Sequence, residues 1–105
     1  MAVNDDTLRL IVDRIVKAIQ PQKIILFGSQ ARGEAGEHAD IDLMIIQETN
    51  LPRHKRYPVV RRLFRGMGIP MDILVYTPDE FARFQSVPGS FTYTVAHEGK
   101  VLYAA

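Results

Sequence analysis

The sequence contains no cysteine and no long hydrophobic run, and neither sign of charge is in clear excess. Without cysteine the chain has no disulfide framework and no thiolate chemistry, which fits a cytoplasmic location. Its apolar runs are too short to cross a membrane, and the acidic start, MAVNDDTLRL, lacks the basic-then-apolar order of a signal peptide. The net charge of +1 excludes strong steering of the whole molecule toward nucleic acid.

What is present is the composition of an ordinary globular protein. With 105 residues, of which 47% are hydrophobic and 24% charged, the chain is expected to form one domain around a modest core. In the first half of the chain, the patterns predict a helix over residues 4–21 that stops at Pro21, a strand over 23–28, a short helical turn and a strand over 40–46. In the second half, they predict a helix from about Pro58 to Gly66, a strand in PMDILVYT and a helix capped by Thr77. A helix that closes at Gly99 and an extended segment over 100–103 are expected to follow. This order indicates an α/β layer fold (an α+β arrangement) with a small mixed β-sheet flanked by helices.

Three aspartates stand where strands are expected to begin. Successive strand side chains point to opposite faces, so Asp40 and Asp42 should project together, away from Ile41. Asp72 lies near the start of the next strand, and the three acids would meet at one end of the sheet if these strands are neighbours. Like charges held together repel, and a divalent cation such as Mg²⁺ turns that repulsion into coordination, as in ion-assisted displacement at phosphorus. The alternative is that each aspartate is exposed or bonds to a turn.

A Gly-Ser pair follows the first expected strand. Gly28 permits close backbone approach, and Ser29 would open a helical turn whose free N–H groups suit a phosphate. The sequence lacks G-x-x-x-x-G-K-[ST], so this element is not a P-loop. A lone Gly-Ser pair is usually only a turn, and what raises its significance is that ten residues separate Ser29 from Asp40.

The segment LFGSQARGEAGEHADIDLMII carries the pattern G-S-x(10)-D-x-D, which resembles the signature of the DNA polymerase β-like nucleotidyltransferase superfamily. Within it, the segment resembles the minimal nucleotidyltransferase (MNT) family, whose usual form is F-G-S-x-A-R-G, a variable loop, then S-D-x-D-L. The likeness extends to the leading helix, PMDILVYTPDEF and the tail HEGKVLY, so residues 1–105 are expected to form a single minimal nucleotidyltransferase domain. One departure is Ala39, where the family usually has serine, which removes a hydroxyl beside the acids and leaves all three acids in place.

This resemblance implies a role for each residue of the motif. Gly28 and Ser29 would hold the β- and γ-phosphates of a nucleotide, and the catalytic, metal-binding acids would be Asp40, Asp42 and Asp72, with Mg²⁺ as the ion. Asp72 would also help to deprotonate an acceptor hydroxyl. Arg32 would either contact phosphate or pin the loop to an acid.

Six of the 13 basic side chains fall in one segment: Arg53, Lys55, Arg56, Arg61, Arg62 and Arg65. They form either a solvated helix face or a surface for a polyanion or an acidic partner. The segment has few aromatic residues and no recognised nucleic-acid motif, so a protein partner is favoured over RNA and direct nucleic-acid binding is not expected.

The remaining histidines and aromatic residues carry no motif. The histidines lack mutual metal-ligand spacing and are expected at the surface: His38, His54 and His97. The phenylalanines Phe81, Phe84 and Phe91 are expected to pack the C-terminal helices, and Tyr93 and Tyr103 to lie in packing or at an interface.

MNT-like proteins of this size are commonly antitoxins paired with an all-helical HEPN ribonuclease toxin. The resemblance therefore implies a Mg²⁺-dependent adenylyltransferase antitoxin that binds such a toxin and transfers AMP from ATP to a toxin tyrosine. The chain has no added domain to grip the base or the acceptor, so specificity should come from the acceptor or from a partner. Two alternatives stay open: an antitoxin that neutralises by binding alone, and a transferase acting on a small molecule such as an aminoglycoside or on RNA.

Overall fold

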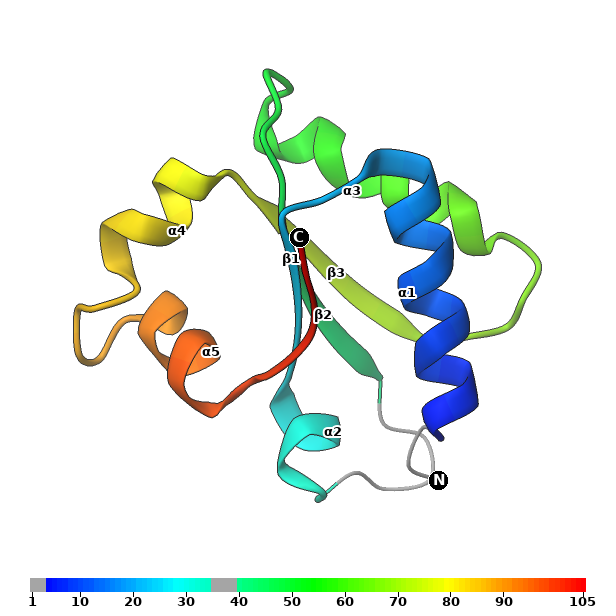
Figure 1. Ribbon diagram of the computed structural model, residues 1–105, viewed down its shortest axis with the longest axis horizontal. Coiled ribbons are helices and arrows are strands. Elements are labelled where there is room, and N and C mark those ends of the chain that lie inside the picture. Colours follow the sequence, from blue (N-terminus) through cyan, green and yellow to red (C-terminus); the bar gives the residue numbers. More distant parts are fainter. Residues whose placement is uncertain (1–3, 35–39) are drawn as a thin grey trace.

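A four-stranded sheet with helices on both faces forms the frame of the molecule. The computed structural model describes residues 4–34 and 40–105 (Figure 1). The elements are, in chain order, α1 (Asp5–Ile19), β1 (Lys23–Phe27), α2 (Gly28–Arg32), β2 (Ile41–Ile46), α3 (Arg53–Arg61), a 3₁₀ turn η1 (Arg62–Phe64), β3 (Met71–Tyr76), α4 (Pro78–Phe84), α5 (Phe91–Glu98) and β4 (Lys100–Ala104).

The strands lie in the order β3-β2-β1-β4. β1 pairs antiparallel with β2 on one side and with the edge strand β4 on the other. β2 and β3 run parallel, so the two strands expected to carry the acids are neighbours. The sheet is therefore mixed, as the sequence predicted, and the C-terminal extended segment is its fourth strand.

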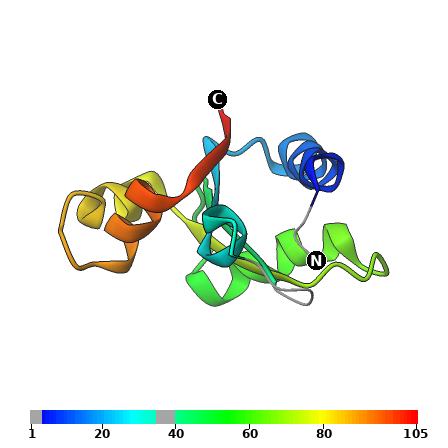
Figure 2. The same ribbon diagram turned by 90° about the horizontal axis from the view of Figure 1, so that it is seen from below.

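Each face of the sheet has its own core. On one face, α1 and α3 contribute buried side chains such as Ile11 and Val60, which pack against Leu26, Leu43 and other alternate residues of the strands. On the opposite face, Phe81 of α4 and Val95 of α5 pack against Ile25, Met44 and Ile46. Figure 2 shows the two helix layers on either side of the sheet, with α2 between them at the near end.

Local signals set the ends of most elements. The Asn4 side chain accepts a hydrogen bond from the Thr7 N–H and caps α1, as expected from the polar start. The Thr77 hydroxyl accepts from the Glu80 N–H while the Glu80 carboxylate accepts from the Thr77 N–H, a reciprocal capping box for α4. β1 ends one residue earlier than predicted, at Phe27, because Gly28 turns the chain at φ +73°.

The prediction that the third helix starts near Pro58 is wrong. α3 starts at Arg53, directly after Pro52, and Pro58 lies inside it. Proline inside a helix removes one backbone hydrogen bond. The earlier start is supported by Arg56, whose buried side chain donates to the carbonyl oxygens of Leu51 (2.8 Å) and Val75 (3.2 Å). These contacts hold the first turns of α3 against β3.

Helix lengths in the described part of the chain are modest. The longest helix, α1, has 15 residues, and no helix within residues 4–34 and 40–105 combines the length and apolar character needed to cross a bilayer.

Candidate active site

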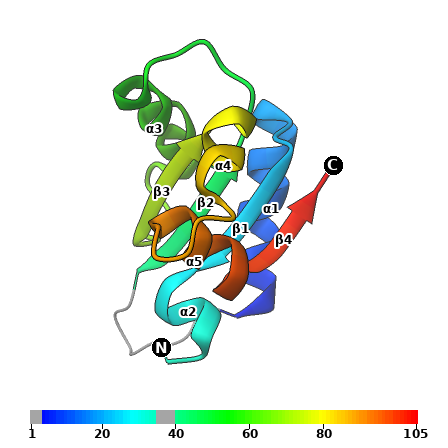
Figure 3. The ribbon, with the colours of Figure 1, turned by 90° about the vertical axis from the view of Figure 1, so that its left-hand side faces the viewer.

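Gly28, Asp42 and Asp72 lie at the same end of the sheet. β1 ends there, whereas β2 and β3 begin there, because β1 is antiparallel to β2 and β2 is parallel to β3. In the strand register, Asp42 lies opposite Phe27 of β1 on one side and opposite Asp72 of β3 on the other. Figure 3 shows this end of the sheet at the bottom, next to α2 and α5.

Asp42 and Asp72 share one face of the sheet. Ile41 and Leu43 belong to the core under α1 and α3, and Met44 belongs to the core under α4 and α5. Because strand side chains alternate, Asp42 projects on the side of Met44, and its cross-strand neighbour Asp72 does the same. The strand register thus brings Asp42 and Asp72 to one face, whereas the shared direction of Asp40 and Asp42 stays a prediction, because Asp40 precedes β2.

The surroundings of Asp42 disfavour the ionised form of its carboxyl group. Burial raises the pKa of Asp42 above its ordinary value, and the carboxylates of Asp72 and Asp40 raise it further. Arg32 acts in the opposite direction and lowers it, without cancelling the rise. A carboxyl group that is desolvated and surrounded by like charges is typical of a functional site rather than of a stabilising surface pair.

Gly28 fits closely against Asp42. Its φ of +73° lies in the left-handed region, and a Cβ built at this position would overlap Oδ2 of Asp42. Glycine is therefore required for two reasons, the backbone conformation and the close approach to the carboxylate. This contact ties the Gly-Ser element directly to the acid pair.

The helix α2 carries Ser29 and Arg32 beside this contact. Its buried residues Gln30 and Ala31 anchor it to the fold, and Gly33 ends it at φ +72°. The Arg32 Nε donates to the Glu34 carboxylate at 3.0 Å. Arg32 was expected either to contact phosphate or to pin the loop to an acid, and in the structure it pairs with Glu34. Its positive charge also lowers the pKa of Asp42.

The acids do not form a closed metal cage. Within residues 4–34 and 40–105, no three acidic or histidine side chains are gathered closely enough to hold an ion as they stand. Asp40 is exposed and precedes β2, whereas Asp42 is half-buried in it. The donors still suit Mg²⁺, because this ion commonly takes one or two carboxylates and completes its shell with water and substrate phosphates. Ala39 and His38 lie outside the described residues.

Two arginines of the basic segment have internal roles. Arg56 donates through Nη1 to Glu80 Oε1 at 2.7 Å, and Arg53 donates to Oε2 of the same carboxylate at 3.3 Å. The Arg53 guanidinium also lies over the Tyr76 ring, 4.9 Å from its centroid. Partial burial opposes the ionisation of Glu80, but hydrogen bonds from Arg56, the Thr77 N–H and Arg53 outweigh it and lower the pKa of Glu80 to about 2. The interpretation of the segment as an open basic surface is therefore wrong for Arg56, which is buried, whereas Arg53 is exposed and pairs with Glu80 at the surface.

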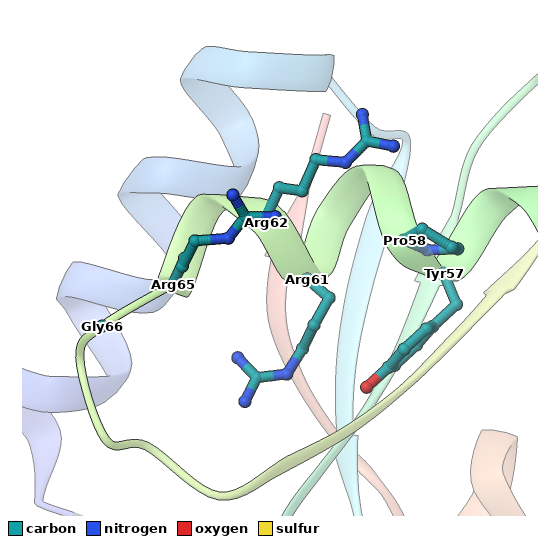
Figure 4. Close-up of a pocket in the computed structure, with 6 residues that line it drawn as sticks. All are labelled: Tyr57, Pro58, Arg61, Arg62, Arg65 and Gly66. Atoms are coloured by element: carbon teal, nitrogen blue, oxygen red, sulfur yellow. The ribbon is translucent and has the colours of Figure 1, made fainter.

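The other arginines line a shallow cavity of about 410 Å³ on α3 and η1. Its lining residues are Tyr57, Pro58, Arg61, Arg62, Arg65 and Gly66 (Figure 4). In this view Tyr57 and Arg61 point to the same side of the helix, and Arg62 points to the opposite side. No acidic residue lines this cavity in the described part of the chain, so its electrostatic character is positive.

The aromatic residues near the C-terminus do not all pack as expected. Phe81 is buried, but Phe84 and Phe91 are 46% and 49% exposed. His54 and His97 are at the surface, as predicted, and the His97 ring stacks on Tyr93 with centroids 3.9 Å apart. Tyr103 is partly buried against the α1 core. No sequence pattern indicated that Phe91 would be exposed beside the candidate site.

A model of nucleotidyltransferase domains matches residues 6–102 of this sequence. The chain belongs to the nucleotidyltransferase domain family. The match spans the Gly-Ser element, both acidic strands and the first part of β4, so the family assignment agrees with the sequence resemblance. As a nucleotidyltransferase, the chain is an enzyme that takes a nucleotide substrate.

Two proteins of Methanocaldococcus jannaschii are similar in sequence, and both are named as proposed protein adenylyltransferases. MJ0604 is 33% identical over 82 residues, which cover 78% of this chain and 78% of that protein. MJ1379 is 38% identical over 55 residues, which cover 50% of this chain and 55% of that protein.

Solved structures show the same nucleotidyltransferase fold. A proposed nucleotidyltransferase from Sulfolobus solfataricus aligns over 94% of this chain and 78% of its own, with a TM-score of 0.67 and 20% identity. A toxin–antitoxin crystallised with AMP-PNP aligns over 98% and 75%, with a TM-score of 0.65 and 20% identity. A mutant of the toxin–antitoxin MntA–HpeT aligns over 98% and 75%, with a TM-score of 0.62 and 17% identity.

Proposed function

We propose that this nucleotidyltransferase is an antitoxin that binds a HEPN ribonuclease toxin and transfers AMP from ATP to a toxin tyrosine with Mg²⁺. The observation that carries the proposal is the pairing of Asp42 with Asp72 beside the Gly28 turn, in a chain of this family. The protein substrate is supported by relatives named as proposed protein adenylyltransferases. The toxin partner is supported by the likeness of fold to toxin–antitoxin nucleotidyltransferases, one of them crystallised with AMP-PNP.

The acids would coordinate the metal, whose positive charge would offset their mutual repulsion. Asp40, Asp42 and Asp72 already raise one another's electrostatic energy, as the raised pKa of Asp42 indicates. Magnesium, when bound, would supply positive charge to the triphosphate and to the acceptor oxygen. Binding would thereby relieve a repulsion that the free protein must tolerate.

The Gly28–Ser29 turn would hold the leaving end of the nucleotide. With no Cβ at Gly28, the triphosphate can approach the backbone close to Asp42, and Ser29 offers a hydroxyl and an N–H group at the start of α2. Arg32 is one turn further along and adds positive charge on this side of the acids.

The transfer itself would proceed by in-line displacement at the α-phosphorus. The tyrosine oxygen of the toxin forms the new O–P bond, the bond from the α-phosphorus to the oxygen that bridges to the β-phosphate breaks, and pyrophosphate leaves. Asp72 accepts the proton of the tyrosine hydroxyl. Reactions of this class depend chiefly on positioning and on electrostatic stabilisation, which suits a small site built from strand ends.

The test is to incubate the purified chain with its toxin, ATP and Mg²⁺ and to weigh the intact toxin. We expect a mass gain of one or more AMP units, which disappears with EDTA and with the double variant Asp40→Ala/Asp42→Ala. Asp13→Ala, which removes an exposed acid of α1, serves as the matched control and should retain transfer.

Two outcomes would replace this proposal with its alternatives. If the double variant still neutralises the toxin fully, neutralisation occurs by binding alone. If labelled AMP from ATP appears on small hydroxylated compounds or RNA and not on the toxin, the acceptor is not the toxin tyrosine.

A further inference from the structure

A small cavity lies between α2 and α5, directly beside Gly28. Its volume is about 240 Å³, and its lining includes Phe27, Gly28, Arg32, Phe91, Thr94 and Glu98. Drug-sized ligands generally need pockets of roughly 300–1,000 Å³. This cavity therefore suits one planar ring system and not a whole nucleotide.

Two aromatic side chains form part of its walls. The Phe27 and Phe91 rings meet edge to face, with centroids 5.5 Å apart and an interplanar angle of 83°. Phe91 is 49% exposed at the first position of α5, so much of its ring surface is open. Exposed aromatic faces of this kind bind nucleobases by stacking, largely without regard to sequence.

Glu98 is one of three polar side chains in the lining, with Arg32 and Thr94, and the Thr94 hydroxyl already donates to the Ser90 carbonyl oxygen at 3.3 Å. Glu98 is the last residue of α5, and no side chain of the described residues forms an ion pair or hydrogen bond with its carboxylate. A carboxylate can only accept hydrogen bonds, so it favours a ring that carries an amino group over one that carries a carbonyl oxygen at the same position.

The position of Gly28 links this cavity to the acids. Gly28 lines the cavity and also contacts Asp42. A nucleotide with its phosphates over the Gly28–Ser29 turn would thus have its base within reach of the cavity. Arg32 lies on the same side, where its charge favours the phosphates.

We propose that this cavity is the nucleobase site of the enzyme, in which Phe91 stacks on the base and Glu98 accepts a hydrogen bond from its exocyclic amino group. The placement of the phosphates rests on the proposed function, and the cavity deepens it by naming the substrate class: a nucleoside triphosphate with an amino-bearing base, such as ATP. These two residues determine specificity and take no part in the chemistry.

The test compares the binding of ATP, inosine triphosphate and inorganic tripolyphosphate by calorimetry, each with Mg²⁺. Phe91→Ala should weaken ATP binding about 10-fold through the loss of stacking, and should leave tripolyphosphate binding unchanged. Phe84→Ala is the matched control, because Phe84 has nearly the same exposure and lies outside the cavity. Phe91→Trp should restore ATP binding. Wild-type protein should prefer ATP over inosine triphosphate, and Glu98→Ala should abolish that preference.

Several results would overturn this proposal. The first is equal affinity of the wild-type protein for ATP and inosine triphosphate. The second is that Phe91→Ala and Phe84→Ala weaken ATP binding equally. The third is that Phe91→Ala weakens the binding of ATP and of tripolyphosphate equally, which would indicate damage to the Gly28 turn. If Phe91→Ala lowers toxin binding and leaves ATP affinity intact, the cavity receives a partner side chain and the proposal also fails. Failure of ATP to bind the wild-type protein at all would count against the proposed function itself.

Discussion

Asp42 and Glu80 are partly buried carboxylates in opposite electrostatic surroundings. Glu80 accepts hydrogen bonds from Arg56, Arg53 and the Thr77 N–H, and its pKa falls to about 2. Burial and the carboxylates of Asp72 and Asp40 raise the pKa of Asp42. The first arrangement stabilises the junction of α3, β3 and α4, whereas the second destabilises the folded chain, and in the function we propose a bound cation would relieve it.

This contrast separates structural acids from functional ones without reference to sequence motifs. Paired charges serve the fold, and like charges held together at a strand end serve a ligand. Natural proteins commonly accept such local conflicts at their functional sites and compensate for them elsewhere. The Glu80 network is a compensating element of this kind.

Exchanging each acid for its amide gives the largest test of the comparison. Asp42→Asn removes a repelled charge, so we expect the melting temperature of the free protein to rise while AMP transfer falls at least about 100-fold. Glu80→Gln should lower the melting temperature and should leave AMP transfer unchanged at temperatures where the variant is folded. Thermal denaturation and intact-mass assays on both variants measure these effects. A fall in the melting temperature of Asp42→Asn would contradict the claim that the charge of Asp42 destabilises the free protein.

The two glycines at the ends of α2 allow a second test of the candidate site. Gly28 and Gly33 have φ values of +73° and +72°. A Cβ added at Gly28 would overlap Asp42, whereas a Cβ added at Gly33 would have no described atom within 4 Å. Both Gly→Ala variants should lose roughly 1–2 kcal/mol of stability from backbone strain. We expect only Gly28→Ala to weaken Mg²⁺–ATP binding, by at least about 10-fold. Equal nucleotide affinity of the two variants would remove the functional significance of the close approach.

The pH dependence of stability should show the two acids with opposite signs. Because the pKa of Glu80 is lowered from 4.5 to about 2, its stabilising contribution is complete above pH 4.5 and is lost as the pH falls toward 2. Asp42, with a pKa raised above its ordinary value of 3.8, makes the folded state bind more protons than the unfolded state, so the stability of the fold decreases as the pH rises from 3.8 through the raised pKa.

Denaturant unfolding between pH 2 and pH 7 measures these contributions. Glu80→Gln should flatten the decline on the acid side, and Asp42→Asn should remove the opposing slope. If Glu80→Gln has the same acid-side decline as the wild-type protein, the Arg56–Glu80 contact does not stabilise the fold as described.

The smallest expected effect concerns the arginines that line the α3–η1 cavity. If the cavity contacts an acidic surface of the toxin, Arg61→Glu/Arg62→Glu should slow association several-fold at low salt, with little effect at high salt. The double variant Arg9→Glu/Lys17→Glu, on α1, is the control, because it also reverses two exposed positive charges. Surface plasmon resonance at two salt concentrations tests this prediction, and equal association rates for the two variants would contradict it.

The sequence predicted the acid pair because strand alternation and motif spacing are local properties. Neighbouring positions in β2 fix the direction of Asp42, and its pairing with Asp72 needed only that β2 and β3 be adjacent. The start of α3 could not be predicted, because it is supported by contacts of Arg56 with Val75 and Glu80, which lie 19 and 24 residues away. The exposure of Phe91 likewise depends on how α5 packs against β1, which no local pattern records.

The most direct test of the account is an NMR titration of the Asp42 carboxyl group, with and without Mg²⁺ and a non-hydrolysable ATP analogue. The account predicts a pKa above the ordinary aspartate value in the free protein, and a pKa below that value once the ion and the nucleotide are bound. A pKa that is already ordinary in the free protein, or one that Mg²⁺ and nucleotide leave unchanged, would contradict the claim that this end of the sheet is built around a metal-bound nucleotide.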